Sequence, residues 1–273
     1  MFAKLERTVT VSATFTTEGN LSINTGKGDG LRDNLVIRDG GAGNNPVISG
    51  SSLKGVVRST VESILAQALG DGQVCVPETC APQNSGKALY DDRMSTLVGQ
   101  GGRQRIVPKG RKLGSRTCKC PACDMFGNTG HAGRTLFHDA RLLCVAGDQG
   151  AKLLTMSRTH VAMRRDTRTQ ASEALMTWET VPADTQFRGD VVLHNPEDWM
   201  VGAVIAVLEM LPKLGLGAKK TAGYGNVKAT ITNADIEVET FGAGGAAPAA
   251  TKEQFLEAWR GKVKAQQSPS TPV

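Results

Sequence analysis

The chain has 273 residues, of which 40% are hydrophobic and 21% are charged, so it can form a sizeable core as one large domain or two small ones. No apolar run is long enough to span a membrane and no signal-peptide pattern opens the sequence, so we expect a cytoplasmic protein with no membrane partner. The net charge of +6 favours a polyanionic partner. Aromatic residues make up only 4% of the chain, so an RNA partner would be held mainly through its backbone.

The N-terminal segment, residues 4–17, alternates hydrophobic and polar side chains, which predicts a half-buried strand. A polar, glycine-rich segment follows from Gly19 to Asn45. It is long for a loop inside a domain, and loops of this length usually carry function or are disordered.

One aspartate in that loop, Asp33, lies in sequence between Arg32 and Arg38. A carboxylate on a loop that faces a substrate can act as a base or hold a divalent cation, and nearby cations would keep it ionised. The alternative is a loop aspartate that caps a turn. Asp29 and Asp39 are weaker candidates, and Asp39, before two glycines, is typical of a turn.

A helix is predicted to begin near residues 48–58, with Ser51 or Ser52 as its cap and a continuous apolar face from Leu53 to Leu69. Free N–H groups, hydroxyls and cations at a helix start form an anion site. We therefore expect phosphates to contact Ser51, Ser52, Lys54 and Arg58. The alternative is an ordinary capped helix with a solvated basic face.

Residues 70–124 have little apolar periodicity and are interpreted as an irregular insertion that carries most of the cysteines. In a reducing compartment, clustered cysteines favour a metal over disulfides. The pair Cys120 and Cys123 can bind one tetrahedral zinc together with two further ligands. The spacing predicts a structural zinc bound by four of the five residues Cys75, Cys80, Cys118, Cys120 and Cys123, with His131 as another possible ligand.

The second half of the chain contains further strands near 134–145, 187–193 and 227–231, and a helix that follows Asn195–Pro196. The order predicts an α+β fold with a βαββαβ plan, in which two helices cover an antiparallel sheet. We expect one domain at 1–235, including an extended arm at 155–182. A flexible tail with a short amphipathic segment is expected at 242–273.

Two basic segments of this half are candidates for contact with a nucleic acid. The glycine-rich loop 215–225 lets backbone N–H groups approach phosphates closely, so Lys219 and Lys220 are predicted to hold them. In the arm, an apolar residue and its cationic neighbours could insert between bases and displace a nucleotide. The residues concerned are His160, Met163, Arg164 and Arg165. For any single lysine, the alternative is a solvated surface position.

Several segments, taken together, form a recognisable set. They are Asp33–Asp39 in the long loop, Pro46–Gly55 at the start of the first helix, Met125–Asn128 with Gly133–Arg134 before the next strand, Arg165–Thr167 with Glu179–Pro182 in the arm, and Gly215–Gly217 through Gly223–Gly225. This set resembles the RAMP superfamily, and more narrowly the repeating backbone subunit of type III CRISPR effector complexes. The five segments resemble, in this order, its catalytic loop, its guide-binding helix start, the approach to its next strand, its thumb hairpin and its glycine-rich loop. The resemblance spans about residues 4–233.

This resemblance implies a ferredoxin-like, RRM-type fold that binds along a CRISPR RNA. It also implies an endoribonuclease that cleaves complementary target RNA at regular spacing with a divalent cation, expected to be magnesium, and Asp33 takes the catalytic position. The implied protein partners are other subunits of the complex, including copies or relatives of this chain. The cysteine-rich insertion resembles zinc-bearing members of subtypes D and E.

Two other functions are compatible with the sequence. The first is a guide-binding subunit of the same complex that does not cut RNA. The second is a guide-processing endoribonuclease that uses histidines as acid and base. It has less support, because the four histidines, His131, His138, His160 and His194, are far apart in sequence.

Overall fold

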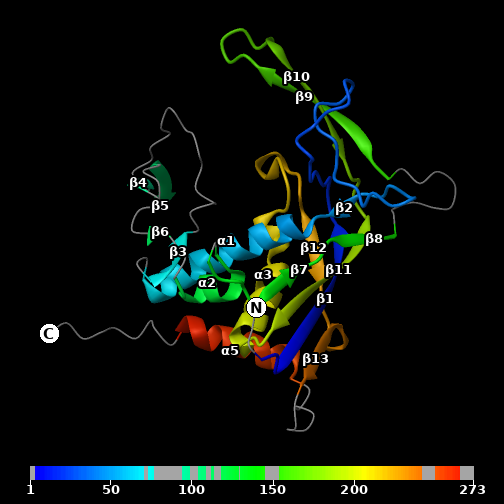
Figure 1. Cartoon of the computed structure of the whole chain (residues 1–273). Coiled ribbons are helices and arrows are strands. Elements are labelled where there is room, and N and C mark those ends of the chain that lie inside the picture. Colours follow the sequence, from blue (N-terminus) through cyan, green and yellow to red (C-terminus); the bar gives the residue numbers. More distant parts are fainter. Residues whose placement is uncertain are drawn as a thin grey trace.

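The computed structural model describes residues 4–70, 73–76, 94–98, 104–108, 112–113, 118–128, 130–144, 154–241 and 250–264 (Figure 1). A central antiparallel sheet dominates this part of the chain. Its main strands lie in the order β12 (Val227–Thr230), β1 (Arg7–Thr17), β11 (Gln186–His194), β8 (Ala140–Cys144) and β2 (Val47–Ile48). In addition, β13 (Ile236–Thr240) pairs with β1, and β7 (Thr135–Phe137) pairs with β11.

Strand β1 forms because its side chains alternate between the core and the opposite face. Val9, Val11, Ala13 and Phe15 are all buried, and Val11 pairs with Val191 of β11. The even-numbered positions carry threonine and serine, which suit a strand with one polar face. This segment therefore behaves as the sequence predicted.

Two long helices connect the strands and pack with them in one core. Helix α1 (Gly50–Leu69) lies in sequence between β1 and β8, and α3 (Asp198–Glu209) lies between β11 and β12. Every third or fourth residue of α1 from Leu53 to Leu65 is buried, as its apolar spacing requires. The predicted α+β fold with an antiparallel sheet is confirmed, and β1, α1, β8, β11, α3 and β12 occur along the chain in the order βαββαβ. A short helix, α4 (Leu211–Leu214), follows α3.

The C-terminal segment corrects the expectation of a flexible tail. Residues Lys252–Lys264 form helix α5, whose Phe255 and Trp259 are buried against α3. The two helices come very close because α3 has Gly202 at the contact, where an added Cβ would lie 1.9 Å from the carbonyl oxygen of Phe255. The folded unit therefore includes α5. Residues 242–249 and 265–273 of the predicted tail lie outside the described residues.

The arm and the insertion stand apart from the main sheet. Strands β9 (Met156–Met163) and β10 (Gln170–Thr180) form a separate antiparallel hairpin, which projects from the top of the molecule in Figure 1. Within the insertion, β3 (Cys75–Val76) pairs with β6 (Lys112–Leu113), and β4 (Met94–Val98) pairs with β5 (Gln104–Pro108). Helix α2 (Pro121–Phe126) packs against α1. None of the helices in the described residues is long and apolar enough to cross a membrane.

Candidate nucleic-acid interface and cysteine cluster

The start of α1 differs from the prediction in its capping residue. Ser49, and not Ser51 or Ser52, is the N-cap, and its hydroxyl accepts a hydrogen bond from the Ser52 backbone N–H at 3.3 Å. The helix begins at Gly50, the residue after the cap, and this position packs directly on β7. A Cβ there would lie 2.3 Å from the carbonyl oxygen of Phe137. The Gly50 N–H already donates to Asp139 at 2.7 Å, so this helix terminus offers fewer free donors than expected.

Of the four residues predicted at this helix start, Arg58 has a different role. Its Nε donates to Glu62 at 2.8 Å, and its guanidinium lies 5.7 Å from the centre of the Phe126 ring. Only 13% of its side chain is exposed. Arg58 therefore joins α1 to α2, and its contact with a phosphate stays a prediction. Ser51 is exposed, and Ser52 and Lys54 are half-buried.

A groove of about 600 Å³ brings together four segments that are distant in sequence. Helix α1 contributes Ser52 and Ser59, the long N-terminal loop contributes Asn24 and Asn34, and the glycine-rich loop contributes Lys220. Trp178 of the arm also lines it. The predicted guide-binding helix start, the loop that carries Asp33 and the glycine-rich loop thus meet at one surface, although Asp33 itself is not among the lining residues.

The two lysines of the glycine-rich loop lie in different environments. Lys220 is exposed and lines the groove. Lys219 has a left-handed backbone with φ of +54°, and its Nζ lies 4.1 Å from the centre of the Trp178 ring. Burial lowers the pKa of Lys219. Lys219 therefore binds the base of the arm through a cation–π contact.

The arm residues predicted to wedge between bases do not lie together. The Nε2 of His160 is 2.9 Å from the hydroxyl of Tyr224, so His160 contacts the glycine-rich loop. Burial, together with the charges of Lys219 and Arg158, lowers the pKa of His160. Met163 lies at the end of β9 and is 59% exposed.

The two arginines of this set lie in the turn of the hairpin. Arg164 pairs with Asp166 at 2.7 Å, and Arg165 is exposed. An apolar side chain next to exposed cations is thus present at the tip, whereas His160 belongs to the base of the arm.

Asp33 is exposed and lies beside β10 of the arm. Its backbone N–H donates to the Thr177 carbonyl at 2.8 Å, and its Oδ2 accepts the Thr177 N–H at 2.6 Å. Arg32 and Arg38 are the cationic neighbours of Asp33 in sequence. Both arginines donate to Glu179 instead, at 3.0 and 2.6 Å.

The other two loop aspartates stabilise turns. The carboxylate of Asp29 accepts the backbone N–H groups of Leu31 and Arg32 and also pairs with the Arg32 side chain, which lowers the pKa of Asp29 to about 2. Asp39 accepts the N–H groups of Gly41 and Asn45, at 3.0 and 3.1 Å, as predicted for a turn residue. This leaves Asp33 as the aspartate of this loop with the strongest case for chemistry.

Glu179, on β10, was missed as a functional candidate from the sequence. Its side chain is 1% exposed. Besides the two arginines, Thr155 donates to Oε1 at 2.7 Å and the Val36 N–H donates to Oε2 at 3.0 Å. Burial alone would raise the pKa of Glu179, but these hydrogen bonds and the charge of Arg38 outweigh it and lower the pKa. One feature of the sequence could have indicated this role: Glu179 lies between Trp178 and Val181, two residues of a type that is often buried. An acidic residue that is buried with such neighbours needs charged or hydrogen-bonding partners.

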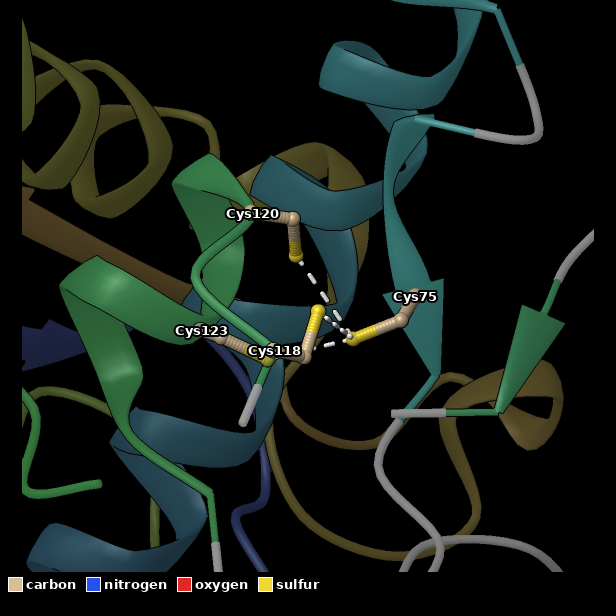
Figure 2. Close-up of side chains that lie close together, drawn as sticks. All are labelled: Cys75, Cys118, Cys120 and Cys123. Atoms are coloured by element: carbon tan, nitrogen blue, oxygen red, sulfur yellow. Dashed lines mark hydrogen bonds between the residues drawn. The ribbon is translucent and has the colours of Figure 1, made fainter. Parts of the chain in front are cut away.

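The four cysteines Cys75, Cys118, Cys120 and Cys123 form a cluster at the base of the insertion, where all of their sulfurs lie within 4.8 Å of one another (Figure 2). The Cys75 sulfur is 3.1, 3.6 and 3.8 Å from those of Cys123, Cys120 and Cys118. Four thiolates around one tetrahedral zinc, with Zn–S bonds of about 2.3 Å, would be about 3.8 Å apart. The cluster therefore fits a metal such as zinc.

The structure thus identifies a set of four among the five predicted cysteines. Cys80 lies outside the described residues. His131 does not belong to the set, and its Nε2 lies 3.6 Å from Asp124 Oδ1. Cys120 is the N-cap of α2 and Cys123 lies within that helix, so the C-x-x-C pair is positioned by α2.

Comparison with known proteins identifies the family. A family model described as the RAMP superfamily matches residues 14–228. The chain belongs to the RAMP superfamily. A comparison with curated protein sequences finds no match.

This RAMP chain is also similar to a solved structure, described as the cryo-EM structure of the Type III-B Cmr-beta bound to cognate target RNA, with a TM-score of 0.52 and 16% identity. The match covers 86% of this chain but only 61% of the other chain. At this identity the similarity supports the fold alone.

Proposed function

We propose that this RAMP chain is a CRISPR RNA-binding backbone subunit of a type III effector complex, in which Asp33 cleaves bound target RNA. The observation that carries the proposal is the groove that joins the start of α1, the loop of Asp33 and the glycine-rich loop. The family membership and the similarity to a chain of a Cmr complex bound to target RNA support it. The other subunits of such a complex would be the protein partners.

The groove supports binding of an RNA backbone. Among the residues that line the groove, Ser52 and Ser59 carry hydroxyls, Lys220 carries a cation, and Asn24 and Asn34 carry amides. Hydroxyls, amides and lysines are the groups with which proteins contact phosphates and sugars, and such contacts position a strand without reading its sequence. A guide of any sequence would therefore fit. Only one aromatic ring, Trp178, is among the groove residues, in keeping with the low aromatic content of the chain.

Target cleavage would take place at Asp33. Its exposed carboxylate has one oxygen bonded to the Thr177 N–H, and in cleavage it would orient the ribose 2′-hydroxyl or accept its proton. Among the described residues, the cysteine cluster is the only group of three or more potential metal ligands. A magnesium ion here would be held by Asp33, RNA phosphate oxygens and water, a ligand set that magnesium uses. The ion would supply neutralisation of charge on the phosphate.

The cysteine cluster would hold a structural zinc. All four positions of a tetrahedral ion would be taken by sulfur, which leaves none open for chemistry. The zinc would link β3 to the start of α2 and thereby hold the insertion against the rest of the domain.

A non-catalytic guide-binding subunit is the second candidate. It is favoured by the 2.6 Å hydrogen bond between the Thr177 N–H and Asp33 Oδ2, because an aspartate that anchors a loop often forms such a contact. In that case the same groove would bind the guide, and another subunit would cut the target.

The test compares Asp33→Asn with Asp39→Asn in the assembled complex. Both replacements keep an oxygen acceptor and remove a charge from the same loop, but Asp39 only closes a turn. We expect Asp33→Asn to reduce target cleavage at least a hundredfold, with guide and target affinity unchanged, and Asp39→Asn to cleave normally. Normal cleavage by Asp33→Asn, with contaminating nuclease excluded, would favour the second candidate.

A further inference from the structure

The buried carboxylate of Glu179, on the arm, helps to hold the loop that carries Asp33. Residues 33–36 run beside β10, where Asp33 pairs with Thr177 and the Glu179 N–H donates to the Asn34 carbonyl at 2.9 Å. The two hydrogen bonds of Asp33 with Thr177 lie at an exposed position. The Glu179 side chain adds a further hydrogen bond, to the Val36 N–H, and ion pairs to Arg32 and Arg38.

These ion pairs hold the side chains of two arginines that are close to Asp33 in sequence. Arg32 is the neighbour of Asp33 in sequence, and Arg38 follows five residues later. Both guanidiniums point to Glu179, and Arg32 also binds Asp29. If Glu179 lost its charge, Arg38 would lose this ion pair and Arg32 would keep only the one with Asp29, a costly arrangement that the loop can relieve by leaving the arm. The freed arginines would then be available to pair with the Asp33 carboxylate.

We propose that Glu179 is the positioning residue of the Asp33 site: it docks the loop on the arm and keeps Arg32 and Arg38 away from the Asp33 carboxylate. This inference rests on the proposed function for its effect on cleavage, while its effect on the loop can be measured separately. Because Glu179 is on β10, it also couples the position of the loop to the position of the arm.

Docking of the loop is measured by limited trypsin digestion of the full-length chain, with mass spectrometry of the fragments. Trypsin cleaves after arginine, so cleavage after Arg32 reports on release of the loop. We expect Glu179→Gln to raise the rate of this cleavage at least tenfold. Glu239→Gln, an exposed glutamate on β13, is the matched control and should leave the rate unchanged.

The effect on the reaction is measured as single-turnover target cleavage in the assembled complex. We expect Glu179→Gln to slow cleavage at least tenfold with unchanged guide and target affinity, since none of the residues that its side chain contacts is among the groove residues. Adding Arg38→Gln removes a cation whose ion pair with Glu179 has been lost, so the double variant should recover part of the lost rate and part of the trypsin protection. A general loss of folding would not be relieved by a second substitution.

The outcomes separate the inference from the proposed function. Unchanged trypsin cleavage after Arg32 in Glu179→Gln overturns the inference, as does a double variant that is more damaged than the single one. A wild-type complex that does not cut target, combined with faster release of the loop in Glu179→Gln, overturns the catalytic function and upholds the docking role of Glu179.

Discussion

Replacing Cys120 by serine tests the cysteine cluster with little disturbance of the backbone. Cys120 is the N-cap of α2 and makes no side-chain capping hydrogen bond, while serine is among the residues preferred at an N-cap. Any loss of stability should therefore come from the missing thiolate. We expect Cys120→Ser to lose most of the bound zinc and the order of the insertion near Cys75, while the main sheet stays folded.

The size of the effect follows from the length of chain that the cluster closes. Cys75 and Cys120 are 45 residues apart. The chain-entropy relation for cross-links gives about 4 kcal/mol for a closed loop of this length, which sets an upper limit because three ligands remain. Helix α2 should stay in place, since Met125 and Phe126 are buried in the core.

The assay combines zinc analysis of the purified chain with hydrogen exchange of the peptides that contain residues 73–76 and 118–120. Cys80→Ser is the matched control, because the four clustered sulfurs already complete a tetrahedral shell. It should keep one zinc per chain. Full zinc content and unchanged exchange in Cys120→Ser would refute the assignment, and so would loss of zinc in Cys80→Ser.

Two further predictions concern elements that position the site. Phe255, on α5, is buried in the protein core, so Phe255→Ala should lower the free energy of unfolding by about 3–5 kcal/mol in chemical denaturation. Leu256 is only partly buried, so Leu256→Ala should lower this free energy by less, and equal effects of the two variants would contradict the packing of α5. Gly50→Ala places a Cβ 2.3 Å from a carbonyl oxygen of β7, so it should destabilise the chain by about 1–3 kcal/mol and weaken guide binding in a filter assay. Gly55→Ala, with no atom within 4 Å of the added Cβ, should instead raise stability slightly, and a similar loss from both would show that close packing at Gly50 is not the cause.

Local patterns in the sequence predicted the elements whose signal lies within a few residues. The alternation in β1 and the apolar spacing of α1 gave the correct strand and helix, and the short spacing of Cys118, Cys120 and Cys123 indicated a metal-binding cluster. The pairing of Arg58 with Glu62 was also open to prediction, because it joins positions four residues apart on one helix.

Contacts between distant segments were not accessible in this way. Glu179 is 147 residues from Arg32 and 141 from Arg38, and nothing near these arginines in sequence distinguishes Glu179 from Asp33 as their partner. The amphipathic segment around Phe255 was recognised, but its partner surface on α3 was not, so the segment was expected to be part of a flexible tail.

The sequence by itself determined the periodic elements, the α+β class and the candidate residues, because these depend on the order of side chains along a short stretch. Only the tertiary structure decided which charges meet. Ion pairs and buried carboxylates depend on distances across the fold, and burial makes an unpaired charge so costly that Arg32 and Arg38 lie with Glu179 and leave Asp33 exposed.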